Sequence, residues 1–264
     1  MSDPERWRQR VPALVARFEE RWGLTLGSPL PGGSASVVCS AIRADGTSAV
    51  LKVGLPHFEA RDEIPGLIFW NGQPSVRLLE ADPGGYAVLL ERCEPGGPLS
   101  DEPAKVQDDV LVDLLPQLWR IPPSTAPFRP LEELISTWAG EVDRGAESWK
   151  TPELVARAHR LFAKLTRSTE CTVLLATDLH AGNVLRAQRR EWIVIDPKPF
   201  LGDPTFDLVQ HLLNHPDRLL EIVDDLALRL ALDPERLRQW VFVRIVLGPV
   251  FGEYPWATVA REVL

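Results

Sequence analysis

The chain has 264 residues, of which 45% are hydrophobic and 25% charged, as is usual for a globular protein with a buried core. Its 37 acidic residues against 29 Lys and Arg give a net charge of −8, which argues against nucleic acid and anionic lipid as partners. The cysteines Cys39, Cys93 and Cys171 are far apart and form neither a disulfide nor a zinc pattern. No apolar run is long enough to span a bilayer, and the charged N-terminus lacks the apolar core of a signal peptide. These features indicate the reducing cytoplasm.

The first third of the chain is expected to be rich in strands. Apolar residues at helical spacing predict a helix over residues 4–22, which Gly23 ends. A second helical stretch is predicted over residues 57–70, with an interruption at Pro65 and Gly66. Turn residues separate four predicted strands, at residues 36–42, 49–53, 76–81 and 86–91.

Beyond a turn-forming segment at residues 93–98, the chain is expected to be mostly helical. Apolar periodicity predicts helices over residues 101–120, 129–147, 152–168, 205–214, 217–231 and 234–247. A short hairpin, formed by residues 184–186 and 191–195, interrupts these helices. The order of elements predicts an α+β fold of two lobes, residues 1–92 and residues 93–264.

One segment carries residue types and spacings suited to phosphoryl transfer. Asp178 is followed five residues later by Asn183, and Asp196 stands eighteen residues on, at the end of an apolar strand. Phosphoryl transfer from ATP needs a carboxylate that orients and deprotonates the acceptor hydroxyl, and oxygen ligands for Mg²⁺. Each residue alone would be read as a turn or cap residue. Their combination indicates ATP and Mg²⁺ as cofactors, with Asp178 as catalytic base and Asn183 and Asp196 as metal ligands.

The segment from Asp178 to Leu185 resembles the catalytic loop of the aminoglycoside phosphotransferase and choline kinase superfamily. The resemblance implies a protein-kinase-like fold, in which residues 1–92 bind the nucleotide and residues 93–264 carry the catalytic loop and the acceptor site. Shorter strings resemble the streptomycin-type aminoglycoside and hydroxyurea phosphotransferases, namely residues 51–53, 70–72, 76–79, 89–93 and 203–208.

Two features of the first lobe suit ATP phosphates. Gly32, Gly33 and Ser34 lie between predicted strands, where their N–H groups would face phosphate oxygens, although an ordinary hairpin turn is the better explanation of this motif taken alone. Lys52 sits in an apolar strand, a costly place for an ammonium without anionic partners. A phosphate-binding lysine meets that condition, and an edge-strand lysine that extends into solvent is the alternative.

The resemblance implies a helical glutamate as the partner of Lys52. Glu63 is preferred because its spacing to the following Trp-x-Gly turn matches the family, and Glu59, on the same helix face, is the alternative. The kinase hinge is assigned to the segment around Glu91 and Cys93, whose backbone groups would bind adenine. Cys93 is also expected to be a small apolar filler.

Two residues are expected to support the catalytic loop. Asp207 resembles the aspartate that braces this loop in the superfamily, although a helix-capping role explains it equally. His180, inside the motif, is expected to be structural. The residues before the catalytic aspartate, usually His-Gly in these enzymes, are Ala176 and Thr177 here, which places the turnover rate and the substrate in question.

The acceptor is expected to be a small polar molecule, with an aminoglycoside of the streptomycin type as the first hypothesis and antibiotic resistance as the result. Three acidic stretches, residues 91–113, 131–153 and 201–230, favour a cationic acceptor, with a solvated acidic surface as the alternative. Hydroxyurea, another small metabolite, or a catalytically silent nucleotide-binding protein are the other hypotheses. Trp7, Trp70 and Trp119 occur in apolar periodic patterns and are expected to fill the core.

Overall fold

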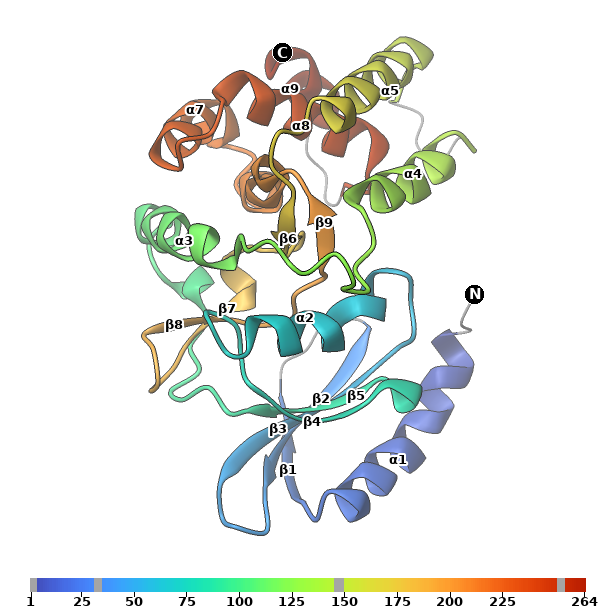
Figure 1. The fold of residues 1–264 in the computed structure, drawn as a ribbon, viewed down its shortest axis with the longest axis vertical. Helices are drawn as coiled ribbons and strands as arrows, with labels where there is room; N and C mark the ends of the chain where they lie inside the picture. The colour runs from blue at the N-terminus through green and yellow to red at the C-terminus, as the bar shows by residue number, and fades with distance from the viewer. Residues whose placement is uncertain (1–3, 31–34, 145–149, 251–254) are drawn as a thin grey trace. The chain divides into compact units, whose positions relative to one another are not determined.

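A computed structural model describes residues 4–30, 35–144, 150–250 and 255–264 (Figure 1). Contacts along the backbone divide the chain into two compact units. The first comprises residues 1–99 and 184–198, and the second comprises residues 100–183 and 199–264. The predicted boundary lies after residue 92, and the return of residues 184–198 to the first unit was not predicted.

The first unit is built on a five-stranded antiparallel sheet in the order β1-β2-β3-β5-β4. The four predicted strands are confirmed to within two residues. The edge strand β1 was not predicted, because it is short and carries Gly27 and Pro29, which weaken the strand signal. The strands are β1 (Thr25–Pro29), β2 (Ser36–Ile42), β3 (Ser48–Gly54), β4 (Leu78–Asp82) and β5 (Ala87–Glu91).

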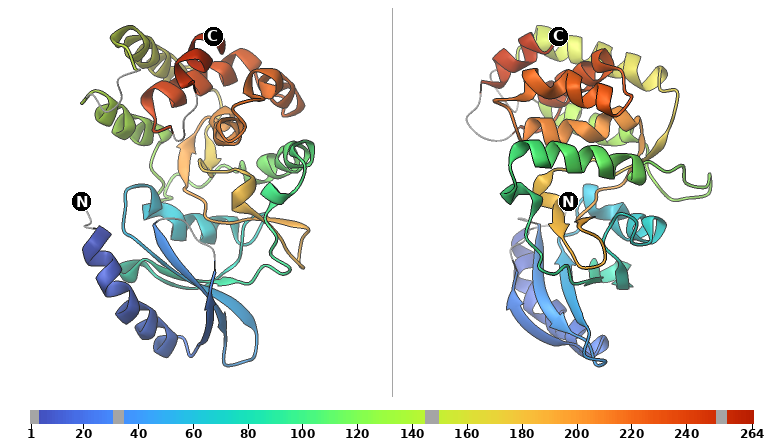
Figure 2. Two further views of the ribbon diagram at one scale, coloured as in Figure 1. Left: turned by 180° about the vertical axis from the view of Figure 1, so that it is seen from behind. Right: turned by 90° about the vertical axis from the view of Figure 1, so that its left-hand side faces the viewer.

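Two helices cover opposite faces of this sheet. Successive side chains of β3 alternate between the faces, so Leu51 packs with Phe18 of α1 (Pro4–Arg21), whereas Val50 packs with Leu67 of α2 (Glu63–Trp70). Figure 2 shows α1 lying along its face of the sheet. The α1 face forms an apolar core. Lys52, two residues after Val50, also points toward the α2 face.

The helix predicted over residues 57–70 forms later than expected. A 3₁₀ turn (Glu59–Asp62) comes first, and α2 begins at Glu63, which makes Pro65 its third residue. N–H groups in the first turn of a helix have no intrahelical partner, so a proline there costs no hydrogen bond. The predicted interruption at Pro65 is therefore wrong: this residue belongs to the start of the helix.

A short hairpin from later in the sequence completes the first unit. Its strands β7 (Val184–Arg186) and β8 (Trp192–Val194) pair antiparallel, as predicted. Ile193 lies in the apolar cluster that also contains Val50 and Leu67. Since the hairpin shares this core, it folds with the first unit although the catalytic-loop segment before it belongs to the second.

The second unit is mainly helical and is organised around α8, of which ten of the fourteen residues are buried. A helix that is apolar on all sides forms the centre of a core, and α8 contacts α4, α5, α6, α7 and α9. The predicted helices are confirmed with shifted ends, except that residues 205–214 form a 3₁₀ turn (Pro204–Leu208) followed by the short α6. The helix predicted over residues 129–147 ends at Val142, and residues 145–147 lie outside the described residues. The elements are α3 (Ala104–Leu118), α4 (Leu131–Val142), α5 (Pro152–Arg167), β6 (Val173–Leu175), β9 (Phe200–Gly202), α6 (Val209–Leu213), α7 (Leu219–Arg229), α8 (Pro234–Leu247) and α9 (Trp256–Glu262).

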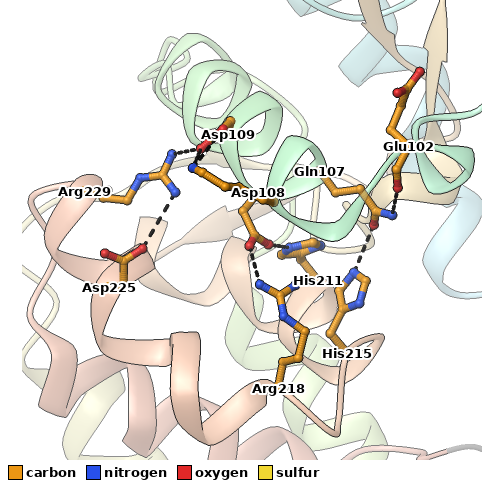
Figure 3. Close-up of polar contacts among 10 residues, drawn as sticks. Glu102, Gln107, Asp108, Asp109, His211, His215, Arg218, Asp225 and Arg229 are labelled. Atoms are coloured by element: carbon orange, nitrogen blue, oxygen red, sulfur yellow. Dashed lines mark hydrogen bonds and ion pairs between the residues drawn. The ribbon is translucent and has the colours of Figure 1, made fainter.

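Polar side chains fasten α3 to the segment that contains α6 and α7 (Figure 3). The buried Asp108 carboxylate lies 2.8 Å from His211 Nε2 and 2.8 Å from Arg218 Nη2. Its neighbour Gln107 contacts His215 Nε2 through Oε1 at 3.0 Å. These five residues are called the α3 polar cluster below. They fix the start of α3 against α6, which directly follows the 3₁₀ turn carrying Asp207.

The predicted α+β class is confirmed by the sheet of the first unit and the helices of the second. Trp70 is fully buried, as predicted, whereas Trp7 and Trp119 are only partly buried. None of the helices in the four described ranges combines the length and apolar character that crossing a membrane requires.

Candidate active site

Lys52 lies in the middle of the sheet rather than at its edge. β3, which carries it, pairs with β2 on one side and β5 on the other. Lys52 is 9% exposed, so its ammonium is removed from water. The alternative of an edge-strand lysine that extends into solvent is therefore wrong, and the ammonium must find anionic partners inside the unit.

Two carboxylates supply those partners. Lys52 Nζ donates to Glu63 Oε1 at 2.5 Å and to Asp196 Oδ1 at 2.6 Å. Burial opposes the charge of Lys52, but the two carboxylates outweigh it and raise the pKa of the ammonium. Burial also opposes ionisation of Asp196, and Lys52 with Lys198 nevertheless lowers the pKa of this carboxyl. Lys52, Glu63 and Asp196 thus form a charged group within the first unit, called the Lys52 cluster below.

The start of α2 explains why Glu63 is the residue that reaches Lys52. Glu63 is the first residue of the helix and is 9% exposed, whereas Glu59 belongs to the preceding 3₁₀ turn. A negative side chain in the first turn is also favoured by the helix dipole. The structure therefore brings Glu63, not Glu59, to Lys52.

Asp196 follows β8 with an unusual backbone conformation. Its φ of 50° lies in the left-handed region, which non-glycine residues seldom occupy outside functional sites. Two residues that the sequence analysis missed, His57 and Lys198, are close enough to affect its pKa. Burial lowers the pKa of His57 itself. Lys198 could have been noticed, because it is a second cation only two residues after the predicted metal ligand.

The segment assigned to the hinge is held by an arginine from the β7–β8 hairpin. Arg189 donates to the Glu91 carboxylate through Nη2 at 2.5 Å and through Nε at 3.2 Å, and to the Gly72 carbonyl at 2.6 Å. The Glu91 N–H donates to the Arg77 carbonyl at 3.0 Å. This N–H is therefore already used within the first unit. Arg189 was not predicted, and its position in a turn gave no signal.

Cys93 is buried, as expected of a small apolar filler. Burial raises the pKa of its thiol to about 11, so the thiol is protonated at neutral pH. A Cβ at Gly96, where φ is 80°, would lie 2.8 Å from the Cys93 carbonyl oxygen. The chain after Cys93 can therefore turn this tightly only with a glycine. The predicted phosphate loop residues Gly32, Gly33 and Ser34 lie outside the described residues.

In the second unit, a tight turn presents Asp178. The Asp178 N–H donates to the Ala176 carbonyl at 2.7 Å, which closes a three-residue γ-turn directly after β6. Thr177, at the centre of this turn, has a φ of 50°. A β-branched residue is strained at such a value, and strain persists only where the surroundings fix it.

Asp207 supplies that fixation. Its Oδ1 accepts the Thr177 N–H at 2.6 Å, and its Oδ2 accepts the Ala176 N–H at 3.1 Å and the Trp119 indole N–H at 3.2 Å. The carboxyl is 1% exposed, and burial raises its pKa to about 6, although the three N–H donors work in the opposite direction. Asp207 thus binds the two amides that define the γ-turn.

The remainder of the loop is fixed by its own side chains. Asn183 Nδ2 donates to the Asp178 carbonyl at 2.9 Å, and His180 Nδ1 accepts the Gly182 N–H at 3.1 Å. A Cβ at Gly182 would lie 2.8 Å from the His180 ring. His180 therefore has structural contacts within the loop, and glycine at 182 leaves room for its ring.

Comparison with known proteins identifies the family. The sequence profile of the family described as aminoglycoside/hydroxyurea antibiotic resistance kinase matches residues 21–253. The chain belongs to this family. It is a kinase similar to the streptomycin 6-kinase of Streptomyces glaucescens, at 35% identity over 93% of this chain and 84% of that protein. The kinase is also similar to the hydroxyurea phosphotransferase of Kitasatospora aureofaciens, at 36% identity over 89% of this chain and 71% of that protein.

Solved structures show the same fold at lower sequence identity. A choline kinase from Streptococcus pneumoniae superimposes with a TM-score of 0.69 at 13% identity, over 97% of both chains. An aminoglycoside phosphotransferase from Streptomyces rimosus, solved with ADP and streptomycin, gives a TM-score of 0.62 at 19% identity, over 91% of this chain and 99% of that chain. The predicted family and the kinase-like fold are therefore confirmed.

The predicted site residues of the kinase fall into two groups. The first unit holds the Lys52 cluster together with Glu91 and Cys93. The second unit holds the residues around the catalytic loop, which are Asp178, His180, Asn183 and Asp207. The contacts within each group are described above, and the catalytic, nucleotide-binding and metal-binding roles stay predictions.

Proposed function

We propose that this kinase transfers the γ-phosphoryl group of ATP to a hydroxyl group of an aminoglycoside of the streptomycin type. The observation that carries the reaction is the Lys52 cluster, a buried ammonium paired with two carboxylates as ATP-binding kinases require. The streptomycin 6-kinase that is similar over 93% of this chain supports the acceptor class. ATP as donor also fits the cytoplasmic location that the separated cysteines indicate.

Each predicted residue has a task in this reaction. Lys52, held by Glu63, positions the ATP phosphates, and the backbone of Glu91 and Cys93 binds adenine. Asp178 orients the acceptor hydroxyl and receives its proton while the hydroxyl oxygen bonds to the γ-phosphorus and ADP leaves. The glycine-rich residues 32–34 would cover the phosphates.

The predicted metal ligands suit Mg²⁺ by their donor chemistry. Asn183 and Asp196 both offer oxygen atoms, which this ion prefers, and its charge would neutralise that of the phosphates. The Asn183 amide nitrogen is used by the Asp178 carbonyl, which leaves its amide oxygen for a metal. Lys52 bonds to Oδ1 of Asp196 and leaves Oδ2. The described part of the chain has no group of three or more His, Cys, Asp or Glu suited to a metal, so phosphate oxygens would supply further ligands.

The proposal of a cationic acceptor is supported by fewer carboxylates than the number in the sequence suggests. Asp203 and Asp207 are buried, and Asp108 is paired inside the α3 polar cluster. These residues cannot attract a soluble cation. Exposed carboxylates remain on α4, at Glu132 and Glu133, and we propose that they contribute to the attraction.

Hydroxyurea is the second candidate acceptor, because the similar hydroxyurea phosphotransferase covers nearly as much of this chain as the streptomycin 6-kinase does. Incubation of the purified protein with ATP, Mg²⁺ and, separately, streptomycin, other aminoglycosides, hydroxyurea and choline would decide between them. Mass spectrometry should show one added phosphoryl group on streptomycin. Phosphorylation of hydroxyurea alone would exclude the aminoglycoside proposal, and no product with any acceptor would favour the silent nucleotide-binding protein.

The role of Asp178 is tested separately. Asp178→Ala should lower kcat by roughly 10²–10⁴-fold, because the variant can neither orient the acceptor nor accept its proton. Binding of ATP, measured by calorimetry, should change little, since the Lys52 cluster is intact. Wild-type turnover by this variant would show that Asp178 is not the base.

A further inference from the structure

Asp207 is a buried carboxylate without a positive partner. Its three bonded groups, the N–H groups of Ala176, Thr177 and the Trp119 side chain, are all uncharged. Within the described residues it forms no ion pair, and neither Arg120, next to Trp119, nor Asp178, next to Thr177, bonds to it. A buried anion of this kind depends on every hydrogen bond that it receives.

Trp119 is the only side chain among these donors. It caps the C-terminal end of α3, and its indole N–H reaches Oδ2, the oxygen that also accepts the Ala176 N–H. Its ring is only partly buried, so filling the core does not account for its position. The other end of α3 is fastened to α6 by the α3 polar cluster. α3 therefore contacts both the 3₁₀ turn that carries Asp207 and the helix that follows it.

We propose that Trp119 is a positioning residue for the catalytic loop: its indole N–H stabilises the ionised Asp207 carboxylate in the orientation that binds the Ala176 and Thr177 amides. These amides hold the strained turn that presents Asp178. The proposal rests on the proposed role of Asp178 as base. The family's usual histidine before the catalytic aspartate is alanine here, so the support of the loop comes from α3 instead.

The chemistry of Asp207 predicts how this support depends on pH. Burial raises the pKa of Asp207 to about 6, so a proton competes with the N–H donors just below neutral pH. A hydrogen bond to a charged group has a free energy equivalent to about one pKa unit or more, so loss of the indole donor should raise the pKa of Asp207 further, by about one unit. Protonation of the carboxyl would weaken the hydrogen bonds that it accepts from Ala176, Thr177 and Trp119.

Trp119→Phe keeps an aromatic ring and removes the donor. We expect the acid limb of the kcat profile to move up by about one pH unit, so that kcat falls about fivefold at pH 6 and is unchanged near pH 8.5. The Michaelis constant for ATP should stay the same, because the Lys52 cluster is untouched. A uniform loss of kcat at all pH values, or no loss, would overturn the proposal.

Stability against denaturant gives a readout that does not require turnover. A carboxyl group whose pKa is raised in the folded state makes the protein less stable as the pH rises from the unfolded to the folded pKa. A further increase in the folded pKa extends this loss of stability to higher pH. The unfolding equilibrium constant of Trp119→Phe, divided by that of the wild type, should therefore increase about tenfold between pH 4.5 and pH 8. A purely packing role would give the same destabilisation at both pH values and would contradict the proposal.

Trp240→Phe is the matched control. Its indole N–H bonds to Oδ2 of another buried aspartate, Asp203, at 2.6 Å, and Asp203 does not bind the catalytic loop. This variant should lose stability without moving the acid limb of kcat. An equal shift in Trp240→Phe would show that the effect is not specific to Trp119. If Trp119→Phe does not fold, the indole N–H resonances of the wild type still test the proposal. The resonance of Trp119 must titrate with a midpoint near pH 6, because its N–H donates to Asp207.

The outcomes separate this proposal from the proposed function. If no acceptor is phosphorylated by the wild type, or Asp178→Ala keeps full turnover, the proposed function fails while the pH-dependent stability of Trp119→Phe still reports the Trp119–Asp207 bond. If the wild type is active and depends on Asp178 but Trp119→Phe has an unchanged acid limb, the positioning role of Trp119 fails alone.

Discussion

At the scale of single residues, the catalytic loop departs from its family at Ala176 and Thr177, and the structure shows the physical effect of the second change. Thr177 occupies a left-handed conformation that glycine adopts freely, whereas an L-residue loses about 1–2 kcal/mol there. The Asp207 hydrogen bond to its N–H maintains this conformation. The loop therefore stores strain next to the predicted base.

Thr177→Gly should relieve that strain. We expect the free energy of unfolding to rise by about 1 kcal/mol, because the gain from the relaxed backbone exceeds the added chain entropy of the unfolded glycine. Urea unfolding followed by circular dichroism measures this. Thr172→Gly, four residues before the start of the turn and in the exposed segment that leads into β6, is the control and should lower stability. Equal destabilisation in both variants would mean that Thr177 is not strained.

At the scale of elements, α3 is the helix that links the polar interior of the second unit to the catalytic loop. Burial opposes ionisation of Asp108, but hydrogen bonds from His211 and Arg218 outweigh it and lower the pKa of this carboxyl. A lowered carboxyl pKa contributes stability that is present above the unfolded pKa of 3.8 and lost as the pH falls through the folded pKa. The attachment of α3 should therefore weaken only in strong acid.

Asp108→Asn tests this attachment. Removing one partner from a buried charged group leaves the others without compensation, so we expect a loss of about 2–4 kcal/mol at pH 7 that diminishes below pH 4. The neighbouring Asp109→Asn is a matched control. Asp109 pairs with Arg229 (Figure 3) and with Lys105 at the surface, so this substitution should cost much less stability than Asp108→Asn. Thermal or urea unfolding at the two pH values provides the comparison. Similar losses in both variants would argue against a special role for α3 in stability.

At the scale of the whole molecule, the net charge of −8 makes long-range electrostatics a test of the acceptor. Attraction between exposed carboxylates and a cationic aminoglycoside is screened as the Debye length falls from ~10 Å at 0.1 M salt to ~3 Å at 1 M. We expect kcat/KM for streptomycin to drop steeply with salt, mainly through KM, while values for neutral hydroxyurea stay constant. Steady-state kinetics at several salt concentrations measure both.

A variant on α4 sharpens this test. Replacing Glu132 and Glu133 together by Gln should raise KM for streptomycin at low salt and flatten its salt dependence, because it removes two exposed charges. The pair Asp224→Asn and Asp225→Asn also removes two charges, but these residues already pair with Arg238 and Arg229, so a smaller effect is expected. An unchanged salt profile in the α4 variant would exclude α4 from substrate attraction.

The family, the kinase-like fold and most of the helices and strands could be predicted from local patterns in the sequence. Strand alternation and helical periodicity are local patterns, so the predicted sheet and helices were recovered with small shifts in their ends. The spacing of Asp178, Asn183 and Asp196 was specific enough to identify the superfamily without any tertiary information. Elements with weak local signals were missed, such as β1 with its glycine and proline, and the three-residue strands β6 and β9.

The pairing of polar groups could not be predicted, because it depends on the tertiary structure. Lys52 bonds to Asp196 across 144 residues of sequence, and Trp119 bonds to Asp207 across 88. Such pairs depend on how strands and helices pack, and no local pattern records them. The bond between Arg189 and the Glu91 carboxylate is another such pair, and packing also selects Glu63 rather than Glu59 as the partner of Lys52. In the same way, most acidic residues of the 201–230 stretch are buried or paired in the fold. Composition counts charges, but burial and pairing determine which of them a ligand can reach.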